Sequence, residues 1–274
     1  MLLSINMPTY ERIESFTQVL LELENEFNSL TPINKTQIEI NIFENHSNDK
    51  FTKNDIVKII KERSAINLNY FINNSNIGGD ENILQCCIAS PNSVFTWVLG
   101  DDDHIVEGSL SKILYCLNTH EKDLGLLLLR DQNPKIDPYM MDKRFDSYFI
   151  FAKAAVYTQP HLLIAHTLIS ANIFRTSIFD AVESAYVTRD LTKRIGLSAN
   201  FSHMRGMVKG LLSNKGCSYC IITPNFISLD TTKCLSTNKI LDSEINKIYY
   251  FYFEWLLTEI GVKGDFLKWD NLVF

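Results

Sequence analysis

The chain lacks an excess of positive charge and lacks any long apolar run. It has 26 Lys and Arg against 32 Asp and Glu, a net charge of −6, which argues against nucleic-acid binding through a basic surface. No apolar stretch is long enough to form a bilayer-spanning helix. The N-terminal segment MLLSINMPTYER has no basic region followed by an apolar one, so it does not indicate a secretory signal. We therefore expect a cytoplasmic protein that binds no nucleic acid.

The sequence also lacks internal repeats, low-complexity tracts and flexible linkers. Its 274 residues, 46% of them hydrophobic, can bury one large core, or one core and a small appended subdomain. The six cysteines include one CxxC, Cys217 and Cys220, but no second pair that would complete four zinc ligands. Because this pair lies in the apolar segment CSYCIIT, we interpret both as core residues.

The most informative segment is VFTWVLGDDDH at 94–104, where an apolar run ends at Asp101, Asp102 and Asp103. A short run rich in β-branched and aromatic residues predicts a buried strand. Three carboxylates on one loop repel each other unless a cation or a donor-rich ligand lies among them. Their oxygens suit Mg²⁺ or Mn²⁺, and Mg²⁺ is commonly shared between carboxylates and substrate phosphates. The alternatives are a solvated acidic turn and a helix N-cap.

Strand and helix patterns alternate through the first half of the chain. The strand-like segments are Leu2–Met7, Gln37–Phe43, Ile66–Ile72 and Val94–Leu99. The helical segments between them are 11–30, 54–63 and 79–89. Strands separated by helices of this length predict right-handed crossovers and a mostly parallel sheet covered on both faces. The predicted fold class is therefore α/β.

Polar or turn-forming residues follow each of these four strands. They are Pro8 to Tyr10, Glu44 to Ser47, Asn73 to Gly79, and the three aspartates. In parallel α/β sheets, ligands bind outside the carboxyl ends of the strands. We therefore expect the four clusters to line one nucleotide-sized cleft.

The second half of the chain is less regular. Strand-like segments are Leu124–Leu129, Thr167–Phe174 and Cys217–Thr223, and helical ones are His203–Leu212 and Leu241–Ile260. Residues 131–147 contain two prolines, several charges and no periodicity, which predicts a loop or a mobile lid.

With these features in place, the chain resembles family 2 glycosyltransferases of the GT-A fold. SINMPTYERIESF matches the first strand and P-T-Y-N-R turn of that family, with Glu11 in place of Asn. EINIFENHSND matches a strand followed by D-(N/D)-G-S-x-D, with Glu44 for the first Asp and His46 for Gly. NNSNIGGDEN matches N-x-G-x-x-x-N, and WVLGDDDH matches the strand that ends in the DxD motif. The ending LGDDD is similar to bacterial enzymes that add sugars to O-antigen or capsule units.

The resemblance implies a mostly parallel nucleotide-binding sheet flanked by helices, with a helical C-terminal region. The GT-A catalytic domain would span residues 1–223. Its nucleotide-sugar-binding half would be 1–106 and its acceptor half 107–223. Residues 224–274 would form a C-terminal helical extension.

The resemblance also implies which residues bind a nucleoside-diphosphate sugar, most readily a UDP-sugar. The first three strand ends would supply Pro8, Thr9, Tyr10, Glu44, Asn76, Gly78, Gly79 and Asn82. Of these, Thr9 and Tyr10 would line the base and ribose, and Glu44 would hydrogen-bond the base. The two glycines would let the backbone approach the nucleotide closely.

The aspartates would bind the ribose and a divalent metal. Asp101 would contact the ribose or the metal, and Asp103 would hold the Mn²⁺ or Mg²⁺ that bridges the two phosphates. Such an ion neutralises charge on the departing nucleoside diphosphate. Asp102 would contribute to the nucleotide site or face solvent.

An inverting enzyme needs an acid or a histidine to deprotonate the acceptor hydroxyl. Family members place a Glu-Asp pair or a lone Asp about a dozen residues before a glycine, here Gly216, and no Glu-Asp pair stands at that spacing. His203 in NFSHMRG is the nearest group that can accept a proton; a helix-start His bonded to backbone, or a metal ligand, is the alternative. Asp190, with Glu183 behind it, is the second candidate, although its segment reads as an amphipathic surface helix.

Two features bear on the acceptor and on partners. Ser170 and Asn172 fall where the family places acceptor-contacting residues. The 241–260 helix carries six aromatics between 249 and 255, and such a stripe could meet a polyprenyl-linked acceptor at the inner face of a bacterial membrane. Because this helix has no basic face, burial or a homodimer interface fits it better.

The leading hypothesis is an inverting, metal-dependent, hexosyltransferase-like enzyme. It would move a sugar from a nucleoside-diphosphate donor to a glycan or lipid-linked acceptor in lipopolysaccharide or capsule synthesis. One alternative is a sugar nucleotidyltransferase, but that class typically opens with a Gly-rich basic loop, and NMPTYERIE has no glycine. The other is an inactive relative that binds only nucleotide or glycan, which the missing Glu-Asp pair favours.

Overall fold

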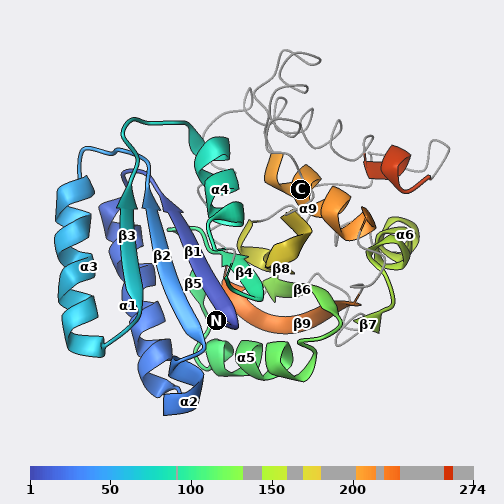
Figure 1. Ribbon diagram of the computed structural model, residues 1–274, viewed down its shortest axis with the longest axis horizontal. Coiled ribbons are helices and arrows are strands. Elements are labelled where there is room, and N and C mark those ends of the chain that lie inside the picture. Colours follow the sequence, from blue (N-terminus) through green and yellow to red (C-terminus); the bar gives the residue numbers. More distant parts are fainter. Residues whose placement is uncertain are drawn as a thin grey trace.

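A computed structural model describes residues 1–90, 92–131, 144–158, 169–179, 202–213, 219–228 and 256–261 (Figure 1). Within these ranges, nine strands form one sheet in the order β3-β2-β1-β4-β8-β6-β9-β5, and β7 pairs with β9. The strands are β1 (Leu3–Thr9), β2 (Ile38–Glu44), β3 (Leu68–Ile72), β4 (Phe95–Val98), β5 (His104–Ile105), β6 (Leu124–Asp131), β7 (Arg144–Phe145), β8 (Asn172–Arg175) and β9 (Tyr219–Ser228).

Helices cover both faces of the sheet, as the alternating pattern predicts (Figure 1). They are α1 (Ile13–Ser29), α2 (Pro32–Lys35), α3 (Lys50–Ser64), α4 (Gly79–Ile88), α5 (Ser109–Thr119), α6 (Tyr148–Thr158) and α9 (Ser202–Ser213). Both α3 and α5 pack against α1, whereas α4 packs against β1, β2, β4 and α9. None of the described helices is both long and apolar enough to cross a bilayer.

The four strands of the first half, β3-β2-β1-β4, are all parallel, as predicted. The second half is mixed, because β8 is antiparallel to both β4 and β6 while β6 and β9 are parallel. The strand expected over Thr167–Phe174 begins only at Asn172, since Ile169–Ala171 form a 3₁₀ turn. Strand β9 continues to Ser228, five residues beyond the catalytic-domain boundary expected at 223.

Successive side chains of β1 point to opposite faces of the sheet. Leu3, Ile5 and Met7 are fully buried and lie on the face opposite to Ser4 and Asn6. Ser4 and Asn6 face α4, where the Asn6 amide donates to the Cys86 carbonyl oxygen at 2.6 Å. A polar network that includes Asn41 and Ser90 satisfies the same groups. Helix α4 is therefore attached to the sheet by specific hydrogen bonds as well as by apolar contact.

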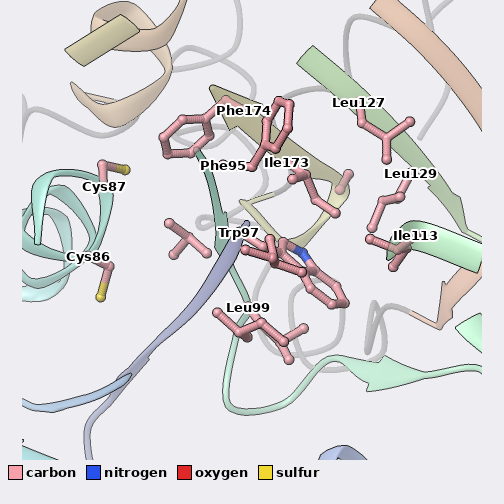
Figure 2. Close-up of a cluster of buried hydrophobic side chains, with 14 of the residues drawn as sticks. Cys86, Cys87, Phe95, Trp97, Leu99, Ile113, Leu127, Leu129, Ile173 and Phe174 are labelled. Carbon is pink, nitrogen blue, oxygen red and sulfur yellow. The ribbon is translucent and has the colours of Figure 1, made fainter. Parts of the chain in front are cut away.

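The core continues across β4, β8 and β6 without a break. Figure 2 shows Trp97 of β4 among Ile173 of β8, Leu127 of β6 and Ile113 of α5, all fully buried. The Trp97 indole N–H donates to the Ser170 carbonyl oxygen at 2.8 Å. This bond fixes the turn before β8, which contains Ser170, against β4.

Several sequence predictions fall outside the described residues. These are the greater part of the 131–147 loop, Glu183, Asp190, Cys217 and most of the 241–260 helix, of which residues 256–259 are seen to be helical.

Candidate functional site

The strand ends predicted to converge do meet at one edge of the sheet. Thr9 lies beside Glu44 in the parallel register of β1 and β2, and Glu44 lies beside Ile72 of β3. The Thr9 hydroxyl donates to Asp101 Oδ2 at 2.7 Å, across 92 residues of sequence. Tyr10, the next residue after Thr9, is exposed. Thr9, Glu44 and Asp101, three of the predicted nucleotide-site residues, therefore lie close together. Tyr10, a fourth, follows Thr9 directly in the chain.

A fully buried lysine, which sequence reasoning missed, lies beneath these residues. The ammonium of Lys53 lies 3.0 Å from Thr9 Oγ1, 3.1 Å from Glu44 Oε2 and 3.2 Å from Asp49 Oδ1. An ammonium has three protons and no lone pair, so these three oxygens account for all its protons. Phe16 of α1 covers it, with the ring centroid 5.4 Å from Nζ.

The helix register explains why this lysine is inside. We expected a helix over 54–63, but α3 begins at Lys50 and so includes Lys53. Residues 53, 57 and 60 are spaced i, i+4, i+7, and Lys53, Val57 and Ile60 are its buried residues. That spacing is the signal by which the lysine could have been found.

Glu44, the expected base-binding acid, is fully buried beside this lysine. Its Oε1 accepts the backbone N–H of Ser47 at 2.7 Å, and its Oε2 pairs with Lys53. The Tyr70 hydroxyl donates to the Lys50 carbonyl oxygen at 2.8 Å and lies 3.4 Å from Glu44 Oε2. Burial, reinforced by the Glu44 charge, raises the pKa of the Tyr70 phenol. In this structure both carboxylate oxygens of Glu44 are engaged by the protein itself.

The third strand end is braced by side-chain amides. Asn45 donates to Asn76 Oδ1 at 2.9 Å and to the Gly78 carbonyl oxygen at 3.2 Å. Asn82, in α4, donates to the Phe43 carbonyl oxygen at 2.9 Å. Gly78 has a φ of +89° and no atom within 4 Å of the position a Cβ would take, so its backbone conformation, rather than crowding, favours glycine there. Gly79 is likewise open on that side.

The three aspartates form a turn after β4 rather than a helix cap. They precede β5, and the first helix after them, α5, begins only at Ser109. The N-terminus of α5 is capped from another element, because the Glu26 carboxylate accepts the N–H groups of Gly108 and Leu110 at 2.7 and 2.9 Å. The helix-cap alternative for the aspartates is therefore wrong.

A hydroxyl group orients each of the two acids expected to bind metal. Ser170 donates to Asp103 Oδ2 at 2.5 Å and accepts the N–H of Gly100 at 2.7 Å. Thr9 donates to Asp101 and accepts from Lys53, since an ammonium can only donate. We call Thr9 and Ser170 the hydroxyl bridges. Ser170, expected near the acceptor, is thus shown to hold an aspartate in place.

Arg12 forms ion pairs with the aspartate turn. Its Nη1 lies 3.5 Å from Asp101 Oδ1 and also donates to Asp102 Oδ2. Asp102 is therefore ion-paired, rather than a solvent-facing bystander. Asp101 is nearly inaccessible, with 3% of its side chain exposed, whereas half of the Arg12 side chain is exposed.

Burial raises the pKa of Asp101 to about 6, against the lowering effects of Arg12 and the Thr9 hydrogen bond. Desolvation therefore disfavours the ionised form of Asp101, and a cation bound next to it would favour that form.

The donor chemistry of the turn is suited to a divalent metal. Asp101 and Asp103 supply hard carboxylate oxygens at the carboxyl edge of the sheet, directly after β4. A Cβ on Gly100 would lie 2.7 Å from Asp103 Oδ2 and 3.3 Å from Asp102 Oδ1, so glycine makes the space in which these oxygens lie. The described residues contain no group of three or more His, Cys, Asp or Glu arranged around a metal position. An ion bound here would complete its shell with phosphate and water oxygens, as Mg²⁺ typically does.

His203, the first candidate base, lies near the start of α9 and is 6% exposed. It lines a small cavity with Cys87 of α4 and Asn172 of β8. The space open to the centre of a water molecule there is about 10 Å³, close to the minimum for one ordered water.

Comparison with known proteins supports the fold. No family model matches the sequence, and no curated protein matches it. S. aureus TarS superposes with a TM-score of 0.54 and 18% identity over 84% of this chain and 36% of that one. TarS 1–349 gives 0.55 and 17%, over 84% and 60%. This chain thus spans less than two thirds of both.

A third similar structure is glucosyl-3-phosphoglycerate synthase from Mycobacterium tuberculosis, solved with Mn²⁺, UDP and phosphoglyceric acid. It superposes with a TM-score of 0.51 and 9% identity over 96% of this chain and 80% of that one. At such identities the likeness shows the fold alone. The chain has the GT-A fold, as its sequence predicted.

We expect Lys53→Met to destabilise the protein by about 3–5 kcal/mol, because Glu44 would stay buried without its counter-charge. Lys58→Met, which removes an exposed lysine of the same helix paired with Asp55, should cost under about 1 kcal/mol. Urea unfolding followed by circular dichroism measures both. The double variant Lys53→Met/Glu44→Gln should recover part of the loss. A Lys53→Met variant within 1 kcal/mol of wild type would contradict this account.

The raised pKa of Asp101 predicts a pH-dependent stability. The folded state keeps the proton up to about pH 6, whereas the unfolded carboxyl loses it near 3.8, so this contribution is complete below 3.8 and is lost as the pH rises through 6. Relative to wild type, Asp101→Asn should gain stability between pH 4.5 and 7.5, by at most about 3 kcal/mol. Urea unfolding in EDTA across that range is the measurement. A stability difference that does not change with pH argues against the raised pKa.

Proposed function

We propose that this protein is an inverting, metal-dependent glycosyltransferase. It takes a sugar from a nucleoside-diphosphate donor and passes it to a glycan or lipid-linked acceptor of a bacterial surface polysaccharide. The observation that carries the proposal is the pair Asp101 and Asp103, each oriented by a hydroxyl bridge at the carboxyl edge of a GT-A sheet. Two similar structures support it: TarS 1–349 in complex with UDP, with a TM-score of 0.50, and the synthase with Mn²⁺ and UDP.

The donor site is proposed to lie over the ends of β1, β2 and β4. Tyr10 is exposed beside Thr9, and an aromatic ring in that place can stack on a base. Pro8 and Thr9 form the floor of the site next to Asp101. Asn76, Gly78, Gly79 and Asn82 shape the wall that leads into α4.

Asp101 and Asp103 are the residues that would hold a Mn²⁺ or Mg²⁺, with Asp102 beside them. When bound, the ion stabilises the negative charge that develops on the departing nucleoside diphosphate. Thr9 and Ser170 keep the two carboxylates in place before any ligand arrives, which lowers the reorganisation needed on binding.

In an inverting displacement the acceptor oxygen attacks the anomeric carbon as the bond to the phosphate oxygen breaks. The hydroxyl proton must go to a base, and we propose His203, or Asp190, for that role. His203 is supported by its position in α9, where it lines the same cavity as Asn172, two residues beyond the hydroxyl bridge Ser170.

The burial of His203 beside a water-sized cavity favours a second candidate function, a relative that binds donor but does not transfer. The two functions differ in what His203→Gln does. In an active transferase the variant keeps donor binding and loses turnover, measured as donor consumption with a glycan acceptor. In a binding-only protein the wild type consumes no donor either.

The proposed donor site predicts stabilisation by UDP together with Mn²⁺. At ligand concentrations about 100 times the dissociation constant, the melting temperature should rise by about 5–10 °C. Asp103→Asn should abolish the metal-dependent part of that rise. Asp55→Asn, at an exposed acid of α3, is the matched control and should behave as wild type. Differential scanning fluorimetry with UDP, CDP and GDP makes the measurement, and no shift in the wild type with any of them overturns the proposal.

A further inference from the structure

Arg12 has a backbone conformation that L-residues adopt infrequently. Glu11 and Arg12, between β1 and α1, have φ values of +55° and +56°, and each left-handed residue costs about 1–2 kcal/mol. The carbonyl oxygen of Arg12 accepts the first helical N–H, from Phe16 at 3.0 Å. The two left-handed residues turn the chain sharply at the edge of the sheet and direct the guanidinium toward the aspartate turn.

The guanidinium lies close enough to Asp101 to interact electrostatically with a metal ion bound there. It contacts Asp101 Oδ1 at 3.5 Å and pairs with Asp102. Lys53 instead donates to the Thr9 hydroxyl, which in turn donates to Asp101. The two cations also differ in freedom, because the Lys53 side chain is fully buried while half of the Arg12 side chain is exposed. Rotating Arg12 away from Asp101 therefore moves a half-exposed side chain, whereas moving Lys53 would displace a buried one.

A divalent ion at Asp101 would repel a guanidinium held a few ångströms away. The same ion brings a diphosphate with it, and a diphosphate offers oxygens that suit the planar fork of an arginine. Arg12 can therefore give up a carboxylate and gain a phosphate while the charge of the site stays balanced.

We infer that Arg12 is an exchangeable counter-ion of this site. Without ligand it neutralises Asp101 and Asp102 and competes with the divalent ion, and when the nucleoside diphosphate binds it moves its ion pair to a phosphate oxygen. This inference rests on the proposed donor and metal site. It assigns to Arg12 two effects of opposite sign, which a residue with a purely structural role would not have.

The test measures Mn²⁺ alone and then UDP with saturating Mn²⁺, on the full chain. Arg12→Gln should bind Mn²⁺ about two- to fivefold more tightly, since an exposed ion pair is weak, and should bind UDP roughly tenfold more weakly. Free Mn²⁺ is followed by electron paramagnetic resonance and UDP by calorimetry. Arg12→Lys keeps the charge and should lie between Arg12→Gln and wild type on both measurements.

Lys58→Gln is the control for general charge, because it removes the same charge from an exposed site that pairs with Asp55. It should leave both affinities as in wild type. If Arg12→Gln matches wild type, or loses affinity for Mn²⁺ and UDP alike, the exchange is overturned while the donor site stands. If wild type and variants bind neither Mn²⁺ nor UDP, the exchange and the proposed function fail together.

Discussion

The ammonium of Lys53 is the interaction on which the carboxyl edge of the sheet depends. It lies without solvent contact among oxygens from β1, β2 and the loop before α3. A charge buried this way is tolerated only when every proton finds an acceptor and an opposite charge is adjacent, and both conditions are met here. Any displacement of one strand end leaves the charge short of a partner, so the three segments are held in a single arrangement.

The donor that each hydroxyl bridge faces fixes the direction of its own proton. Lys53 can only donate, so the Thr9 proton has to point to Asp101, and the Gly100 N–H imposes the same direction on Ser170 and Asp103. Hydrogen-bond chains of this kind strengthen each member. Side chains of β1, of the segment between β1 and α1, and of the turn before β8 hold the two acids, which explains why the turn that carries them needs no regular structure of its own.

Much of this could be read from the sequence, and the reason is topological. Apolar runs that stop at polar clusters locate strand ends, and parallel pairing brings those ends to one edge. The meeting of Thr9, Glu44 and Asp101 was predictable for that reason. Lys53 was not predicted, because a lysine in the first turn of a helix usually faces water and only its spacing from Val57 and Ile60 shows otherwise. The partnership of Arg12 with Asp102 depends on two left-handed residues, for which no residue type in that segment gives a signal.

The Gly100 geometry changes how the LGDDD segment is understood. The φ of Gly100 is not among the positive values found in the described residues, so its backbone conformation does not require glycine. What it supplies is room: a single methyl group there would intrude on two carboxylates. The absence of a side chain at position 100 thus shapes the aspartate turn, and a substitution at this one position would change the spacing between acids whose own identities had not changed.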